Sequence, residues 1–161
     1  MRWTGEPLLR RQLEGHRGEW ELVACGRPVG SLSVRGAFRE RIEATGPSGA
    51  WEFREHWSRL EISRGDGAAP VARYEPNGWG GGHITTASSQ RYEWRRRGFW
   101  KPVHEIATDS GFTCLLFRPR RSLSRVTCEV VIEPLGRRIP ELEALLFLGW
   151  RLHVQRRKHA H

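Results

Sequence analysis

The sequence predicts a mainly β protein whose strands close into an antiparallel barrel around a hydrophobic C-terminal helix. Two observations carry this prediction. From Glu19 onward, apolar and polar residues alternate with a period of two, and turn residues interrupt the alternation every 6 to 10 positions. Near the end of the chain the period changes, and the stretch from Ala144 to Trp150 has no polar side.

About eleven short strands follow one another without a helical period between them. They are expected at residues 19–25, 29–34, 38–44, 50–53, 57–63, 71–74, 83–87, 91–95, 100–107, 112–117 and 125–132. An open sheet of this length would leave costly edges. The strands are therefore expected to close into a barrel or to fold into a sandwich.

Residues 1–18 are treated as an N-terminal lead-in to one barrel domain over residues 19–161. Leu8, Leu9 and Leu13 have helical spacing, but a proline and two arginines among them keep any helix short. The segment fits a twelfth strand, a helical turn or a frayed lead-in.

A helix is predicted from Pro140 to about Arg157. Proline suits the first turn, and Glu141 and Glu143 follow where the helix dipole favours acids. The apolar middle is roughly 16 Å long, too short for about 30 Å of bilayer hydrocarbon. It matches the bore of a β-barrel instead, and Gly149 would let the helix approach the barrel wall closely.

The chain contains a short internal repeat. The stretch from Trp51, WEFREHWSRLEISRGDGAAPVARYEP, is similar to YEWRRRGFWKPVHEIATDSGFTCLLFRP from Tyr92. In both, an aromatic-Glu-aromatic-Arg strand leads to a second strand, an Asp/Gly turn and a third strand. Duplicated meanders suit a barrel, and convergent strand chemistry is the other explanation.

With this strand order, repeat and terminal helix, the chain resembles the tubby-like C-terminal superfamily of tubby proteins, phospholipid scramblases and LURP-one-related proteins. The resemblance extends from residue 19 to about residue 157, and it is to the short bacterial members. It implies a closed antiparallel barrel of about twelve strands with the C-terminal helix through its centre. No run matches the phosphoinositide-binding positions of tubby proteins, or the calcium-binding or palmitoylated segments of scramblases, so those activities are not transferred to residues here.

The charge of the chain favours an acidic partner. The 161 residues carry a formal net charge of +9, and 25 of the 27 basic residues are arginine. Basicity of this size suits phospholipid headgroups or nucleic acid. Because the arginines are spread along the chain, a coding bias toward arginine explains them at least as well.

The cysteines and the chain ends suggest a cytoplasmic protein. Cys25, Cys114 and Cys128 are far apart in apolar or alternating runs, so we expect reduced, small core residues. Neither a signal peptide nor a membrane span is recognisable. His153, His159 and His161 are expected to belong to a solvated tail.

The glycine-rich loop Asn77-Gly78-Trp79-Gly80-Gly81-Gly82-His83 is the first candidate site. Its backbone N–H groups could bind an anion, and Trp79 could insert into a membrane interface or stack on a base. The simpler interpretation is a flexible or tightly turned connection between strands.

The densest basic patch with aromatic residues is the second candidate. Its members are Arg95, Arg96, Arg97, Trp100 and Lys101, together with Arg118, Arg120 and Arg121. Basic side chains interleaved with aromatic rings suit anionic lipid surfaces or nucleic acid. The simpler interpretation is a solvated hairpin whose Phe99 and Trp100 pack inward.

The sequence offers no catalytic, metal-binding or cofactor motif, so a non-enzymatic binding protein is expected. Its ligand is predicted to be anionic phospholipid headgroups, at the inner membrane surface, or another acidic ligand at a basic face. The alternatives are a barrel that binds single-stranded nucleic acid through Trp94, Phe99 and Trp100, and a protein-interaction module. Oligomeric state is left open.

Overall fold

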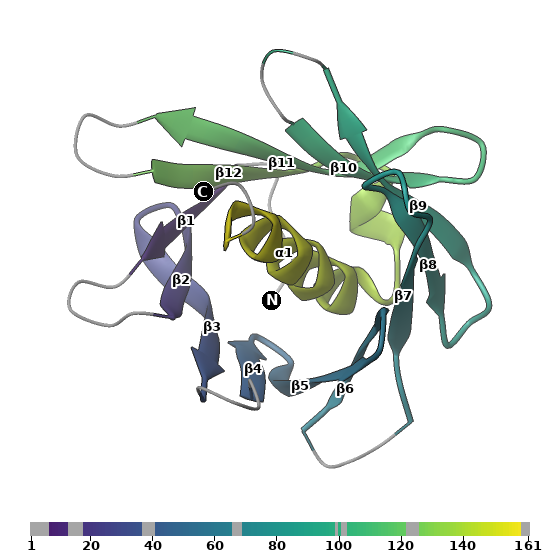
Figure 1. The fold of residues 1–161 in the computed structure, drawn as a ribbon. Helices are drawn as coiled ribbons and strands as arrows, with labels where there is room; N and C mark the ends of the chain where they lie inside the picture. Colours follow the sequence, from purple (N-terminus) through teal and green to yellow (C-terminus); the bar gives the residue numbers. More distant parts are fainter. Residues whose placement is uncertain are drawn as a thin grey trace.

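The computed structural model is a closed barrel of twelve antiparallel strands, all within the described part of the chain, around α1 (Leu142–Lys158) (Figure 1). The structure describes residues 7–12, 18–36, 41–65, 69–98, 100, 103–121 and 126–158. The strands are β1 (Leu8–Gln12), β2 (Glu19–Ala24), β3 (Arg27–Arg35), β4 (Arg41–Gly46), β5 (Gly49–His56), β6 (Arg59–Arg64), β7 (Ala72–Pro76), β8 (Gly82–Thr86), β9 (Arg91–Arg97), β10 (Val103–Thr108), β11 (Thr113–Arg121) and β12 (Val126–Ile132). A short 3-10 helix, η1 (Gly136–Arg138), lies between β12 and α1.

The barrel closes through its first strand. Leu8 of β1 pairs with Val130 of β12, and Leu9 pairs with Val23 of β2. Each of the other strands pairs with its neighbours in sequence. Of the three possibilities for the N-terminal segment, the twelfth strand is therefore the one that the structure shows. The barrel thus includes Leu8–Gln12, which the sequence pattern assigned to the lead-in. A strand at this place pairs the backbone groups that β2 and β12 would otherwise expose as sheet edges.

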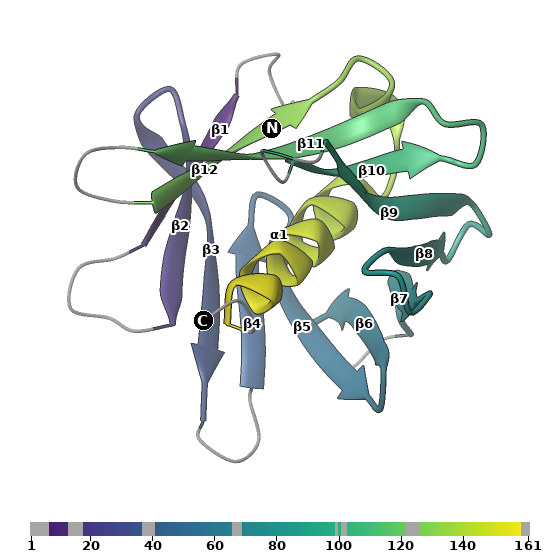
Figure 2. The same cartoon turned by 45° about the horizontal axis from the view of Figure 1, so that its top comes forward.

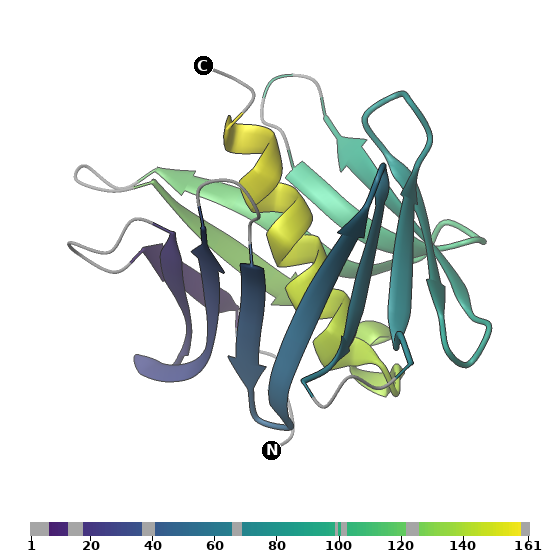
Figure 3. The same cartoon turned by 60° about the horizontal axis from the view of Figure 1, so that its bottom comes forward.

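α1 runs through the barrel, as predicted (Figure 2 and Figure 3). Every residue from Ala144 to Val154 is buried, which explains why the stretch from Ala144 to Trp150 has no polar side; Arg151 and His153 are the buried polar residues that follow it. The period-two strands supply the other half of the core, because alternate side chains point at the helix. Fully buried examples are Leu22, Leu32, Ile62, Ile84, Ile106, Leu115 and Phe117.

Two predictions about individual residues were wrong. Cys25 is exposed, because β2 ends at Ala24 and Cys25 and Gly26 both adopt positive φ in the tight β2–β3 turn. Cys114 and Cys128 are buried thiols, as predicted. His153 is buried inside the barrel, where its ring lies 5.3 Å from that of His104. His159 and His161 lie outside the described residues.

The expected close approach at Gly149 is confirmed. A Cβ atom at this position would overlap the ring of Phe117 and lie 3.1 Å from Cδ1 of Ile106. Both neighbours are fully buried and have no space to withdraw into. Glycine is the residue that lets the helix pass this part of the wall.

Replacing Gly149 by alanine is expected to destabilise the protein by about 1–3 kcal/mol through overpacking. The steric cost should exceed the gain of about 1 kcal/mol that alanine brings to a helix interior. Urea unfolding measures the difference. The double variant Gly149→Ala/Phe117→Leu serves as the control, since the smaller side chain should recover part of the loss. A single variant that is more stable than the parent would contradict the close-packing interpretation.

Candidate functional site

The two ends of the barrel differ. Antiparallel strands place successive hairpin loops at opposite ends. Leu142, at the start of α1, shares a cavity with Ser48, whereas Gln155 near its end shares one with Trp57. The β5–β6, β7–β8 and β9–β10 loops therefore lie at the end where α1 finishes (Figure 3).

Three tryptophans stand on these three loops. Trp57, Trp79 and Trp100 have relative exposures of 103%, 95% and 91%, and we call this set the tryptophan rim. Loops that follow one another at one end are two strand spacings apart, about 10 Å. The other large exposed apolar side chains of the described chain, Phe112 and Leu135, lie at the opposite end. The three most exposed large apolar side chains among the described residues thus lie on one arc of the barrel.

Trp57 and Trp100 were predicted inside strands, and the structure corrects both. Trp57 lies in the two-residue turn between β5 and β6 with a φ of 56°, and Trp100 precedes β10. A bulky residue with positive φ is uncommon in proteins. The inward packing considered for Trp100 is excluded by its exposure, and Phe99 lies outside the described residues.

The loop of Trp79 is a structured turn. The side-chain oxygen of Asn77 accepts hydrogen bonds from the backbone N–H groups of Trp79, at 3.1 Å, and Gly81, at 3.3 Å. The hydroxyl of Tyr74 donates to the carbonyl of Gly81 at 2.9 Å. Two of the N–H groups that could have bound an anion are therefore used within the loop. The tightly turned connection is the interpretation that fits, and it presents Trp79 to solvent.

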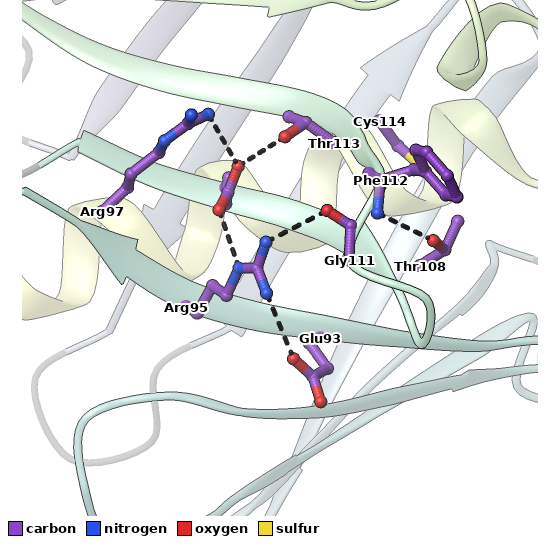
Figure 4. Close-up of polar contacts among 9 residues, drawn as sticks. Glu93, Arg95, Arg97, Thr108, Gly111, Phe112, Thr113 and Cys114 are labelled. Carbon is purple, nitrogen blue, oxygen red and sulfur yellow. Dashed lines mark hydrogen bonds and ion pairs between the residues drawn. The ribbon is translucent and has the colours of Figure 1, made fainter.

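The basic patch is brought together on β9 and β11, but part of it is neutralised. Nε of Arg95 donates to Oε1 of Glu105 at 2.7 Å, and another of its nitrogens donates to the carbonyl of Gly111 (Figure 4). Arg97 lies 3.6 Å from the other oxygen of Glu105, which also accepts a hydrogen bond from Thr113. Arg95 also lies 3.7 Å from Glu93. Arg95 and Arg97 are thus paired with acidic side chains of β9 and β10.

Glu105 is the centre of this network and is only 2% exposed. Burial by itself would raise its pKa. The hydrogen bonds from Thr113 and Arg95, with the charges of Arg95 and Arg97, more than offset burial and lower the pKa of Glu105 below its ordinary value. The carboxylate is therefore held ionised.

The remaining candidates divide into exposed residues and residues that the structure leaves out. Arg96, Arg118 and Arg120 are exposed near the tryptophan rim end of β9 and β11. Lys101 and the side chain of Arg121 lie outside the described residues. Trp94, proposed for base stacking, is 1% exposed and stacks on His104 at 5.1 Å inside the barrel.

Neither a metal centre nor a membrane-spanning helix is present in the part of the chain that the structure describes. No group of three or more His, Cys, Asp or Glu side chains could hold a metal ion there. No helix within those residues is long and apolar enough to cross a bilayer. Comparisons with protein-family models, curated proteins and solved structures found no match to this chain.

Sequence reasoning missed Trp57 and Glu105 for different reasons. Turns of two residues usually carry Asn, Asp or Gly, so nothing indicates a turn at Trp57-Ser58. Glu105 meets Arg95 and Thr113 across two strand pairings, and the register of those pairings is needed to bring them together.

Replacing Glu105 by glutamine keeps the side-chain shape and removes its charge. The variant is expected to lose about 1–3 kcal/mol of unfolding free energy at neutral pH, since its charged hydrogen bonds weaken. Because folding lowers the pKa of Glu105, the difference from the parent should be full above the ordinary value of 4.5 and should shrink as the pH falls below it.

Urea unfolding at neutral and at acid pH measures this effect. Glu43→Gln is the matched control, because Glu43 pairs with Arg41 on the exposed surface and should change stability by less than about 0.5 kcal/mol. An equal loss for Glu105→Gln at both pH values would show that charge plays no part.

Proposed function

We propose that this protein is a non-enzymatic peripheral membrane-binding protein that docks on anionic phospholipid through the tryptophan rim. The observation that carries the proposal is the position of Trp57, Trp79 and Trp100 on three consecutive loops of one barrel end, each almost fully exposed. Tryptophan is enriched at membrane–water interfaces, where its ring is half apolar and half polar.

The form of the loops supports insertion rather than incidental exposure. Trp57 is held at positive φ, and the loop of Trp79 has positive φ at Gly78 and Gly80 and is fixed by Asn77. Rings on ordered turns can enter an interface with little loss of conformational entropy. The spacing of about 10 Å between loops would let all three rings reach one plane.

Positive charge at the same end supports an anionic surface. Arg96, Arg118 and Arg120 are exposed at this end. A cation near an anionic bilayer contributes about 1 kcal/mol. Tryptophan insertion and charge attraction together supply the two signals that stable peripheral binding requires.

The nucleic-acid alternative has weaker support. Single-stranded nucleic acid is bound in a basic groove whose aromatic rings stack on successive bases. Trp94 is buried, and Arg95 and Arg97 are engaged by Glu105 and Glu93. The exposed tryptophans protrude from loop tips, which suits insertion into a soft interface better than a groove.

Membership of the tubby-like superfamily and a place at the cytoplasmic membrane face belong to the same proposal. The closed barrel with a helix through its centre is the arrangement that the resemblance implies. The proposed binding surface, however, rests on the loops of this chain.

The test is flotation with vesicles of phosphatidylcholine alone and of equal parts phosphatidylcholine and phosphatidylglycerol. The parent is expected to bind the mixed vesicles, and to bind more weakly as salt rises. The variant Trp57→Ala/Trp79→Ala/Trp100→Ala should bind at least about a hundredfold more weakly, since each buried ring contributes roughly 1.5–3 kcal/mol.

Phe112→Ala/Leu135→Ala is the matched control, because it removes exposed apolar side chains from the opposite end. It should bind like the parent. Vesicle binding that survives loss of the three rings would refute the proposal, and so would a preference for single-stranded DNA over mixed vesicles in direct competition.

A further inference from the structure

The end of the barrel where α1 begins carries a cavity that the proposed membrane contact does not use. Its volume is about 600 Å³, within the range of about 300–1,000 Å³ that small-molecule sites occupy. Residues from the β4–β5 turn, β5, β6, the segment before β7 and the chain from η1 into α1 line it. It lies at the opposite end from the tryptophan rim.

One wall of the cavity is fixed by polar contacts. Oε1 of Glu143 accepts hydrogen bonds from Nε1 of Trp51, at 2.9 Å, and from the backbone N–H of Ser48, at 3.3 Å. Arg64 donates to the carbonyl and the hydroxyl of Ser48 at 2.8 Å each, and its guanidinium lies 4.1 Å from the centre of the Trp51 ring. The charges of Glu143 and Arg64 are thus committed to the structure of this wall.

Glu141 and Arg137 also line the cavity, and neither takes part in the polar contacts of this wall. Oε2 of Glu141 is buried and has no hydrogen-bond partner among the described residues. Arg137 is exposed and makes no ion pair within the same part of the chain. A buried carboxylate oxygen without a donor is costly, so this position favours a ligand that brings one.

The charge of Glu141 influences the pKa of Tyr92, a buried residue of β9. Burial raises the pKa of the Tyr92 hydroxyl, and the nearby Cys114 and Glu141 raise it further. Val71 and Ile139 supply partly buried apolar surface in the same cavity. An acidic group, a basic group and an aliphatic wall therefore line one cavity that is open to solvent on one side.

We propose that this cavity binds a small zwitterion with an aliphatic body, of the short-peptide class. Its ammonium group meets the carboxylate of Glu141, its carboxylate meets the guanidinium of Arg137, and its aliphatic side chains lie against Val71 and Ile139. A ligand with only one of the two charges leaves either Glu141 or Arg137 without a partner.

The experiment titrates the full chain with three probes and follows backbone amide resonances by NMR. The probes are leucyl-leucine, its N-acetyl derivative, which lacks the ammonium, and its C-terminal amide, which lacks the carboxylate. Leucyl-leucine should bind and shift resonances of residues that line the cavity. Each derivative should bind about tenfold more weakly or worse, the loss of one charged contact.

Two variants assign the contacts. Glu141→Gln should weaken leucyl-leucine at least about tenfold while leaving the N-acetyl derivative unchanged, and Arg137→Gln should do the same for the amide. Arg138→Gln is the control, because this neighbouring arginine does not line the cavity. Melting temperatures verify that each variant is folded. The variant without the three rim tryptophans should bind leucyl-leucine like the parent, which separates this site from membrane docking.

Three results would overturn the inference. They are no binding of leucyl-leucine at millimolar concentration, equal affinity for all three probes, and an equal effect of Glu141→Gln on leucyl-leucine and on its N-acetyl derivative.

Discussion

A helix that is apolar on every side has to be covered on every side, and a barrel of twelve strands has a lumen that must be filled. Barrels of about eight strands fill their interior with their own side chains, whereas wider barrels enclose a cavity or a channel. Here α1 occupies that space, and residues Ala144 to Val154 are all buried. Each element therefore supplies the apolar surface that the other needs. The fit is close, as the contact of Gly149 with Phe117 shows.

α1 occupies the interior of the barrel, with residues Ala144 to Val154 buried. The candidate sites lie on the outer wall and at the two ends. On the wall, Glu105 pairs with Arg95 and Arg97, so two of the four arginines of β9 are engaged within the structure. At one end the loops carry the exposed rings of the tryptophan rim. At the other end a cavity is lined by the acidic Glu141 and the basic Arg137. The two proposals use opposite ends and are independent of each other.

The architecture was accessible from the sequence, and the surface was not. Alternation with a period of two reveals strands, and the apolar stretch from Ala144 to Trp150 reveals the central helix, because both patterns are local. Strand ends are harder, since alternation continues into loops, as at Trp57 and Trp100. Whether a charged side chain on a strand has an ion-pair partner depends on the register of the strand pairing. Only the pairing of β9 with β10 shows that Arg95 faces Glu105. The net positive charge of the basic patch is therefore smaller than its number of arginines suggests.

The direction of α1 determines which end of the helix lies at the tryptophan rim. With twelve antiparallel strands, β12 finishes at the end of the barrel where β1 begins. The loops of Trp57, Trp79 and Trp100 lie at the opposite end. A helix that starts there and fills the barrel must finish at the tryptophan rim (Figure 3). The C-terminal end of α1 thus lies at the same end of the barrel as the exposed rings, and Gln155 and Trp57 line one cavity there. A closed barrel whose neighbouring strands are all antiparallel needs an even number of strands, so the placement of α1 follows from the closure of the barrel itself.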